Sequence, residues 1–304
     1  MNRKRTLRIL GTIVGGAAVA ATAFYAYATI RADARAERRY DVPVAPLTIS
    51  GSPEALARGE HLVRALAKCT DCHGDDLGGK TMVDDGMVGT LAGPNITRGG
   101  VGADLTTDDW VRAIAHGVGR DGRPLAAMPA KDYSALGESD VADIIAYVRS
   151  APPVERTTPP VRVGPALRIM MTAGSFELYA AESVDHARPM ASSPRPEANA
   201  VYGEYLARTG GCFGCHGPNL RGGAVPGMPP GTPKATDISP SGVMATWTKQ
   251  DFANALRLGR RPDGSALKDP MPWQATARMT DTEVEALYLY LKLPATNRAV
   301  LSAL

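Results

Sequence analysis

The fold is decided by two stretches of the 304-residue chain, Cys69-Thr70-Asp71-Cys72-His73 and Cys212-Phe213-Gly214-Cys215-His216. Each stretch places two cysteines three positions apart and a histidine directly after the second cysteine. Together they contain all 4 cysteines of the chain, and they lie 143 positions apart in the sequence. The chain therefore holds two copies of one motif, which indicates an internal repeat.

This spacing is that of C-x-x-C-H, the attachment signature for c-type haem. Thiols three positions apart lie on one helical turn, so both can add to the vinyl groups of one porphyrin. The histidine that follows then lies beneath the iron as an axial ligand. The sequence therefore predicts two covalently attached haem c groups, held by Cys69, Cys72 and His73 in the first copy and by Cys212, Cys215 and His216 in the second.

Three other sites would use the same cysteines. A redox C-x-x-C pair needs no following histidine and usually lies in an α/β pattern, which is absent here. A four-cysteine zinc site would have to bring together two pairs from distant parts of the chain, and it would leave both histidines unexplained. The third alternative is a disulfide between the cysteines, since disulfides are common in exported proteins. Haem is favoured because it accounts for all 4 cysteines and both histidines.

The similarity between the two copies extends beyond the motifs. Residues Gly59–Leu62 resemble Gly203–Leu206, and Met-Pro follows each motif at the same distance. Apolar residues at positions i, i+3, i+4 and i+7 within 141–148, and again within 284–291, predict an amphipathic helix that closes each unit. Each unit is thus a small helical domain whose first helix leads into the motif.

A methionine is the predicted sixth ligand of each iron. Met128 lies 55 positions after His73, and Met271 follows His216 at the same spacing. Met is a common filler of hydrophobic cores, but a Met before Pro in a loop is poorly placed for that role. A thioether at the sixth position favours reduced iron and raises its potential.

Other side chains compete for the same role. Met87 follows His73 and Met228 follows His216 at similar short spacings, so the two methionines roughly correspond to each other. His116 is a further alternative for the first haem, but the residue at the equivalent position of the second copy is Leu258. The backbone carbonyl of Pro94 is a candidate acceptor for the other ring N–H of the first motif histidine.

The N-terminus differs from the rest of the chain in charge and hydropathy. Residues 1–40 carry eight Lys/Arg and two Asp/Glu, whereas the remaining residues carry 26 and 29, so no nucleic-acid-binding face is expected. The uncharged stretch 9–30 is long enough to cross a membrane and longer than the apolar part of a typical removable signal. The basic start favours the cytoplasmic side, so we predict a signal anchor in the cell (inner) membrane with the haem units facing the periplasm or outer side.

The predicted organisation has five parts. A long free loop between the units is improbable, and the apolar middle of the connecting segment is expected to pack across one or both haem units. The parts are a signal anchor or transmembrane helix at 1–30, a tether at 31–50, domain 1 at 51–152, a strap at 153–197 and domain 2 at 198–304.

The sequence resembles tandem class I cytochromes c, and more closely the cytochrome c subunits of membrane-bound alcohol and gluconate dehydrogenases. This resemblance implies an all-α fold of two tandem class I cytochrome c domains, here preceded by an N-terminal transmembrane helix. Those subunits usually carry three haem motifs and often anchor through the C-terminus, whereas this chain has two motifs and an apolar N-terminus. The likeness covers both repeats and is carried by Cys69–Gly74, Gly93–Thr97, Trp110, Gly122, Ala127–Pro129 and their second-copy equivalents.

The function expected from these features is electron transfer without catalysis. A membrane-tethered dihaem cytochrome would carry electrons between a membrane or periplasmic dehydrogenase, or a quinol-oxidising complex, and a downstream acceptor. Its expected partners are redox proteins, namely a dehydrogenase subunit, an oxidase or another cytochrome. The alternative is a dihaem enzyme resembling a peroxidase, which requires one haem with an open sixth site.

Overall fold

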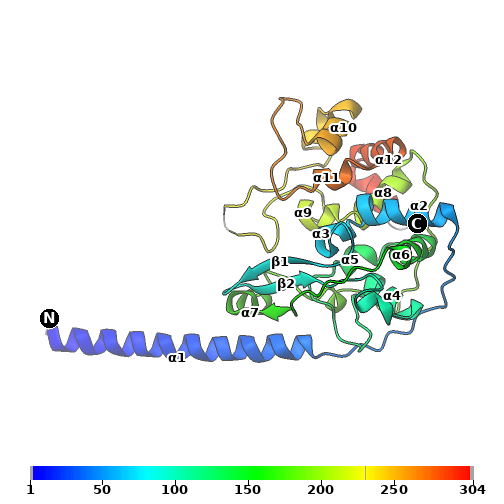
Figure 1. The fold of residues 1–304 in the computed structure, drawn as a ribbon. Coiled ribbons are helices and arrows are strands. Elements are labelled where there is room, and N and C mark those ends of the chain that lie inside the picture. The colour runs from blue at the N-terminus through cyan, green and yellow to red at the C-terminus, as the bar shows by residue number, and fades with distance from the viewer. Residues whose placement is uncertain (1–2, 230, 302–304) are drawn as a thin grey trace.

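The chain folds into a long projecting helix and two helical units that lie against each other, as the computed structural model shows for residues 3–229 and 231–301 (Figure 1). The first unit contains α2 (Pro53–His61), η1 (Leu62–Leu66), α3 (Cys69–His73), η2 (Val101–Ala103), α4 (Thr107–Val111), η3 (Arg112–His116), α5 (Ala130–Tyr133) and α6 (Glu138–Ser150). The second contains α8 (Ala200–Thr209), α9 (Cys212–His216), η5 (Val243–Ala245), α10 (Lys249–Leu258), α11 (Trp273–Thr276), α12 (Asp281–Lys292) and α13 (Ala295–Leu301). The projecting helix is α1 (Arg3–Ala36), and α7 (Pro165–Thr172) and η4 (Ala180–Glu182) lie between the units in sequence.

Each unit is built around one close crossing of two helices. In the first, α2 crosses α6 at Gly59, where an added Cβ would lie 2.0 Å from the carbonyl oxygen of Asp143. In the second, α8 crosses α12 at Gly203, where an added Cβ would lie 2.0 Å from the carbonyl oxygen of Ala286. Both crossings require glycine, because any side chain would force the helices apart.

We expect Gly59→Ala to destabilise the protein by about 1–3 kcal/mol, since the added methyl group has to displace backbone atoms. The measurement is the free energy of unfolding from a denaturant titration followed by circular dichroism. Gly51→Ala is the control, because no heavy atom lies within 4 Å of its added Cβ. Equal stabilities of the two variants would show that the crossing tolerates a side chain.

The repeat continues into the backbone conformation. Leu77 and Leu220 both adopt the left-handed region, with φ of 59° and 62°, and each lies four positions after the motif histidine of its unit. Capping boxes begin the equivalent helices α4 and α10, where Thr106 pairs with Asp109 and Thr248 with Asp251. The two units therefore share local geometry as well as sequence.

A small antiparallel sheet corrects the prediction of an all-α fold, although the structure is mostly helical. The strands β1 (Lys80–Asp85), β2 (Gly89–Gly93) and β3 (Arg162–Val163) pair in the order β1-β2-β3. The carboxylate of Asp85 caps the hairpin turn by accepting from the backbone N–H groups of Met87 and Val88. At the other end of β2, an added Cβ on Gly93 would lie 2.1 Å from the carbonyl oxygen of Cys72, so the strand packs directly on the first motif.

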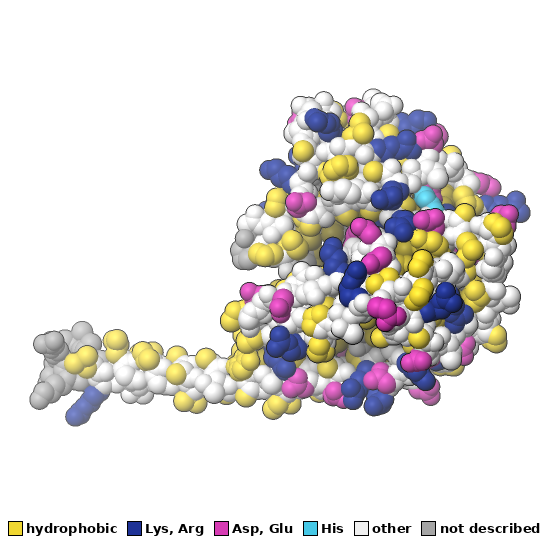
Figure 2. Space-filling view, in the orientation of Figure 1, with side chains coloured by type: hydrophobic (Ala, Val, Ile, Leu, Met, Phe, Trp, Pro, Cys, Tyr) yellow, Lys and Arg dark blue, Asp and Glu magenta, His cyan; other side chains and the backbone are white. Residues whose placement is uncertain are grey.

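The helix α1 is longer than the apolar stretch that predicted it. Among the described residues, Leu7–Ala36 is the stretch long and apolar enough to span a membrane by length and composition. Figure 2 shows hydrophobic side chains along its projecting part. Its last turns pack on α7, where Arg168 donates to the carbonyl oxygen of Thr29 at 3.2 Å and to the carboxylate of Asp33 at 2.7 Å. The C-terminal end of α1 is therefore held against α7 by these hydrogen bonds.

The segments predicted as a tether and a strap both lie on the first unit. Val42 of the tether is buried with Val118 and Ala181, so residues after α1 follow the surface of this unit. In the strap, the carbonyl oxygen of Leu178 accepts from the backbone N–H of Ala127 at 2.8 Å. The strap thus holds the loop that leads to the first predicted methionine ligand.

The two units share one hydrophobic core and a buried polar network at their junction. Glu283 is 1% exposed and lies 2.8 Å from the ring Nε2 of His61 in the other unit. Burial alone would raise the pKa of Glu283, but the hydrogen bond and charge of His61, together with the charge of Arg58, hold it below its usual value. Across the same junction, the Tyr205 hydroxyl donates to Asp140 at 2.5 Å. These contacts fix how the two motifs face each other.

Candidate haem sites

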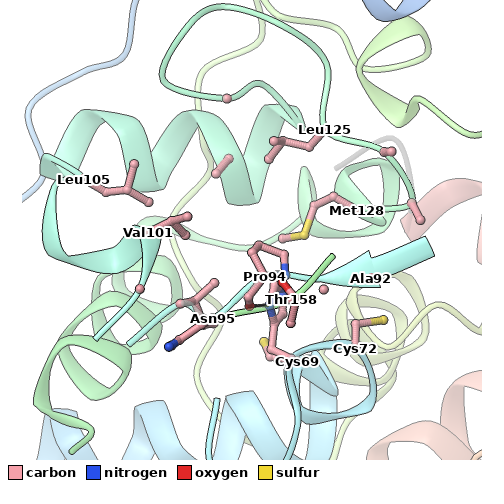
Figure 3. Close-up of a pocket in the computed structure, with 18 of the residues that line it drawn as sticks. Cys69, Cys72, Ala92, Pro94, Asn95, Val101, Leu105, Leu125, Met128 and Thr158 are labelled. Carbon is pink, nitrogen blue, oxygen red and sulfur yellow. Dashed lines mark hydrogen bonds between the residues drawn. The ribbon is translucent and has the colours of Figure 1, made fainter. Parts of the chain in front are cut away.

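A cavity of about 970 Å³ lies in the first unit, and all four predicted ligand and attachment residues of that unit line it. The motif residues Cys69, Cys72 and His73 come from α3, while Met128 comes from the loop before α5. Figure 3 shows the Met128 side chain pointing into the cavity, across from Cys69 and Cys72. The fold therefore brings together residues that are distant in the sequence.

The motif histidines are oriented by backbone carbonyls. The Nδ1–H of His73 donates to the carbonyl oxygen of Pro94 at 2.8 Å, and that of His216 donates to the carbonyl oxygen of Thr236 at 2.7 Å. A carbonyl only accepts, so the lone pair of each ring is on Nε2. Burial lowers the pKa of both imidazoles, and the carbonyl hydrogen bond opposes it only in part. Each ring is thus neutral and held in the tautomer that ligates iron through Nε2.

A buried polar atom in the cavity wall also fits a bound porphyrin. Trp110 lines the cavity, and its indole N–H is buried without a hydrogen-bond partner among residues 3–229 and 231–301. A buried donor is normally satisfied, so a group in this cavity is expected to supply an acceptor. A haem carboxylate has the required chemistry, and the residues present therefore fit haem.

The thiols do not fit the other uses of a C-x-x-C pair. All four cysteines are free, and burial raises the pKa of Cys69 to about 12 and that of Cys212 to about 11. Redox-active cysteines have a lowered pKa instead. Within the described part of the chain, no three His, Cys, Asp or Glu side chains gather to hold a metal ion, which leaves the zinc alternative unsupported.

The competing ligands of the first unit lie away from the cavity. Met87 is 59% exposed at the turn between β1 and β2, and it does not line the cavity. His116 is buried, with its Nδ1 3.2 Å from Nδ1 of His186. Burial, followed by the charges of His186 and Arg112, lowers the pKa of His116 to about 4. The geometry thus favours Met128.

The second unit has a smaller cavity at the equivalent place. Its volume is about 300 Å³, and it is lined by Thr236, Val243, Trp247, Arg261, Pro262 and Asp263, whose counterparts in the repeat line the larger cavity. Met271 is half-buried against the shared core and is not part of this lining. The competitor Met228 is 40% exposed. The motif histidine His216 is likewise outside this lining, although its ring is oriented by the carbonyl oxygen of Thr236.

The first part of the strap supplies a wall of the first cavity, whereas the sequence led us to expect that its apolar middle packs across the haem units. Thr157–Val161 line the cavity, and the buried Asn95 holds this segment by donating to the carbonyl oxygens of Val154 at 2.6 Å and Arg156 at 3.0 Å. Asn95 follows Pro94 in a stretch that the sequence analysis singled out, but its partners lie far along the chain. No local pattern marks such a contact.

Comparison with known proteins supports two domains of one kind. Residues 54–148 match the family model described as cytochrome C oxidase, cbb3-type, subunit III, and residues 200–293 match the model for cytochrome c. The cytochrome c subunit of alcohol dehydrogenase (quinone) from Gluconacetobacter polyoxogenes is 34% identical over 131 residues, which is 41% of this chain and 27% of the relative. The fructose dehydrogenase cytochrome subunit from Gluconobacter japonicus is 38% identical over 108 residues, 33% of this chain and 22% of the relative.

A further relative is similar over most of its length. The diheme cytochrome c-type protein from Cereibacter sphaeroides is 25% identical over 277 residues, which cover 81% of this chain and 88% of the relative. By contrast, the match spans only about a quarter of the length of the dehydrogenase subunits. The likeness to those subunits thus concerns a part of them.

Proposed function

We propose that this chain, which carries two cytochrome c domains in tandem and two covalently bound haem c groups, is a membrane-tethered dihaem c-type cytochrome that transfers electrons. It takes electrons from a membrane or periplasmic dehydrogenase or a quinol-oxidising complex and passes them to a downstream acceptor. Each haem, when bound, supplies one-electron chemistry through its iron. The protein makes or breaks no substrate bond in this role.

The observation that carries the proposal is the arrangement in the first cavity. Cys69, Cys72, His73 and Met128 all line this cavity, so the two cysteines would attach the porphyrin, and His73, held by the carbonyl oxygen of Pro94, and Met128 would ligate its iron. Cys212, Cys215, His216 and Met271 would have the same roles in the second unit. With both axial positions filled by the protein, an iron exchanges electrons but has no open position for a substrate.

The helix α1 supports attachment to the cell (inner) membrane. Its apolar surface is exposed, and its C-terminal end is bound to α7, which would hold the haem domains close to the bilayer. The basic start of the chain favours the periplasmic or outer side for these domains. Relatives named as dehydrogenase subunits favour a dehydrogenase as the electron donor. An oxidase or another cytochrome is the corresponding acceptor.

The test is an optical spectrum of the purified, dithionite-reduced protein with and without carbon monoxide. We expect carbon monoxide to leave both haems unchanged, since six-coordinate iron has no free position. Myoglobin under the same conditions is the positive control. A haem that binds carbon monoxide readily would contradict the carrier role for that unit and favour the peroxidase-like alternative.

A further inference from the structure

The two haem motifs meet at a junction that Lys68 spans. The ammonium of Lys68 donates to the carbonyl oxygen of Gly210 in the other unit at 2.6 Å and to its own unit's Leu66 carbonyl oxygen at 3.1 Å. Lys68 directly precedes Cys69, and Gly210 lies two positions before Cys212. Figure 1 accordingly shows α3 and α9 close together.

The backbone at Lys68 is one that lysine rarely adopts. Its φ of 52° lies in the left-handed region, and the equivalent position of the second unit is Gly211, with φ of 72°. A non-glycine residue in this region costs about 1 kcal/mol or more. Lysine therefore adopts this backbone conformation at a higher free-energy cost than the glycine of the other copy. In return, its side chain makes the hydrogen bond to Gly210, which glycine could not make.

Neighbouring groups hold the same junction. The Tyr133 hydroxyl donates to the carbonyl oxygen of Ala67, the residue before Lys68. The carboxylate of Asp132 lies 3.1 Å from where a Cβ on Gly211 would be, and the Lys68 charge acts on it. The same ammonium acts electrostatically on Cys69 and Cys212. The junction thus combines one bridging cation with contacts to both attachment sites.

We propose that Lys68 is a positioning residue for electron exchange between the two haems, and that its hydrogen bond to Gly210 is the route between the two motifs. Along the chain, Cys69 and Cys212 are separated by 143 positions, whereas the path through this hydrogen bond crosses only Lys68, Gly210 and Gly211. Electron tunnelling weakens steeply with distance and is more efficient through bonds than through space. This inference rests on the proposed function, because it requires both haems to take part in electron transfer.

The test compares variants of the full-length holoprotein. Lys68→Met keeps the aliphatic chain and removes the donor, Lys68→Arg restores a donor, and Lys249→Met removes an exposed lysine that pairs with Glu285 away from the junction. The rate of interhaem exchange is measured by NMR exchange spectroscopy of haem methyl resonances in partly reduced samples, at several protein concentrations. The part of the rate that does not depend on concentration is intramolecular.

We expect Lys68→Met to slow intramolecular exchange by roughly ten- to a hundredfold, since small losses of positioning change rates by that order. Lys68→Arg should recover most of the rate, and Lys249→Met should match the wild type. An unchanged rate in Lys68→Met with two intact haems would overturn the proposal. If Lys68→Met fails to assemble, Lys68→Leu, which also lacks a donor, takes its place with the same expected loss. A wild type that lacks two redox-active haems would instead contradict the proposed function.

Discussion

Removal of both thiols of the first motif, in a Cys69→Ser/Cys72→Ser variant, is expected to leave a protein with one covalent haem in place of two. Serine cannot form the thioether bonds, and His73 and Met128 alone do not retain haem through denaturation. The cavity of about 970 Å³ would also lose the group that fills it, so the first unit is expected to become less stable. The readouts are the mass of the denatured protein and the pyridine haemochrome absorbance per chain.

The repeat provides a matched control for this experiment. Cys212→Ser/Cys215→Ser should also carry one haem, and the variant lacking all four thiols should carry none. The two double variants then allow the spectrum of each haem to be recorded separately. Two haems per chain in either double variant would show that the motif cysteines are not the attachment points.

Replacement of Met128 by alanine is expected to produce the second largest effect. Loss of the thioether opens the sixth position of the first haem, because the competing candidates Met87 and His116 do not line the cavity. Its midpoint potential should fall by on the order of 0.1 V or more, within the span of about 0.8 V that axial ligands cover. A potentiometric titration and carbon monoxide binding to the reduced protein measure the two changes.

Met87→Ala is the control, since its side chain is exposed at the hairpin turn. It should keep the wild-type potential and bind no carbon monoxide. Met271→Ala is the parallel variant in the second unit and should change the second haem in the same way. A wild-type potential in Met128→Ala would refute the assignment of Met128 as a ligand. A shifted potential in Met87→Ala would identify Met87 as the ligand instead.

Local patterns were sufficient to predict the chemistry of the sites. The spacing of each motif is local, so it places both thiols and the histidine on one helical turn wherever that turn lies. The repeat also relates residues of the first unit to equivalent residues of the second, which are distant in the sequence. Pro94 was a candidate acceptor for the first motif histidine, and the structure adds Thr236, at the equivalent position of the second copy, in the same role. That second acceptor has no side-chain signature, because a backbone carbonyl is present at every residue.

The sequence by itself determined the two motifs, their repeat and the helices whose apolar stripes form the core, because each depends on residues near one another along the chain. Only the tertiary structure decided that the strap forms a wall of the first cavity, that β3 adds to the hairpin and that Lys68 reaches Gly210. These contacts join residues far apart in sequence, and their partners are mostly backbone atoms. Their existence follows from how the two units pack, which no local pattern specifies.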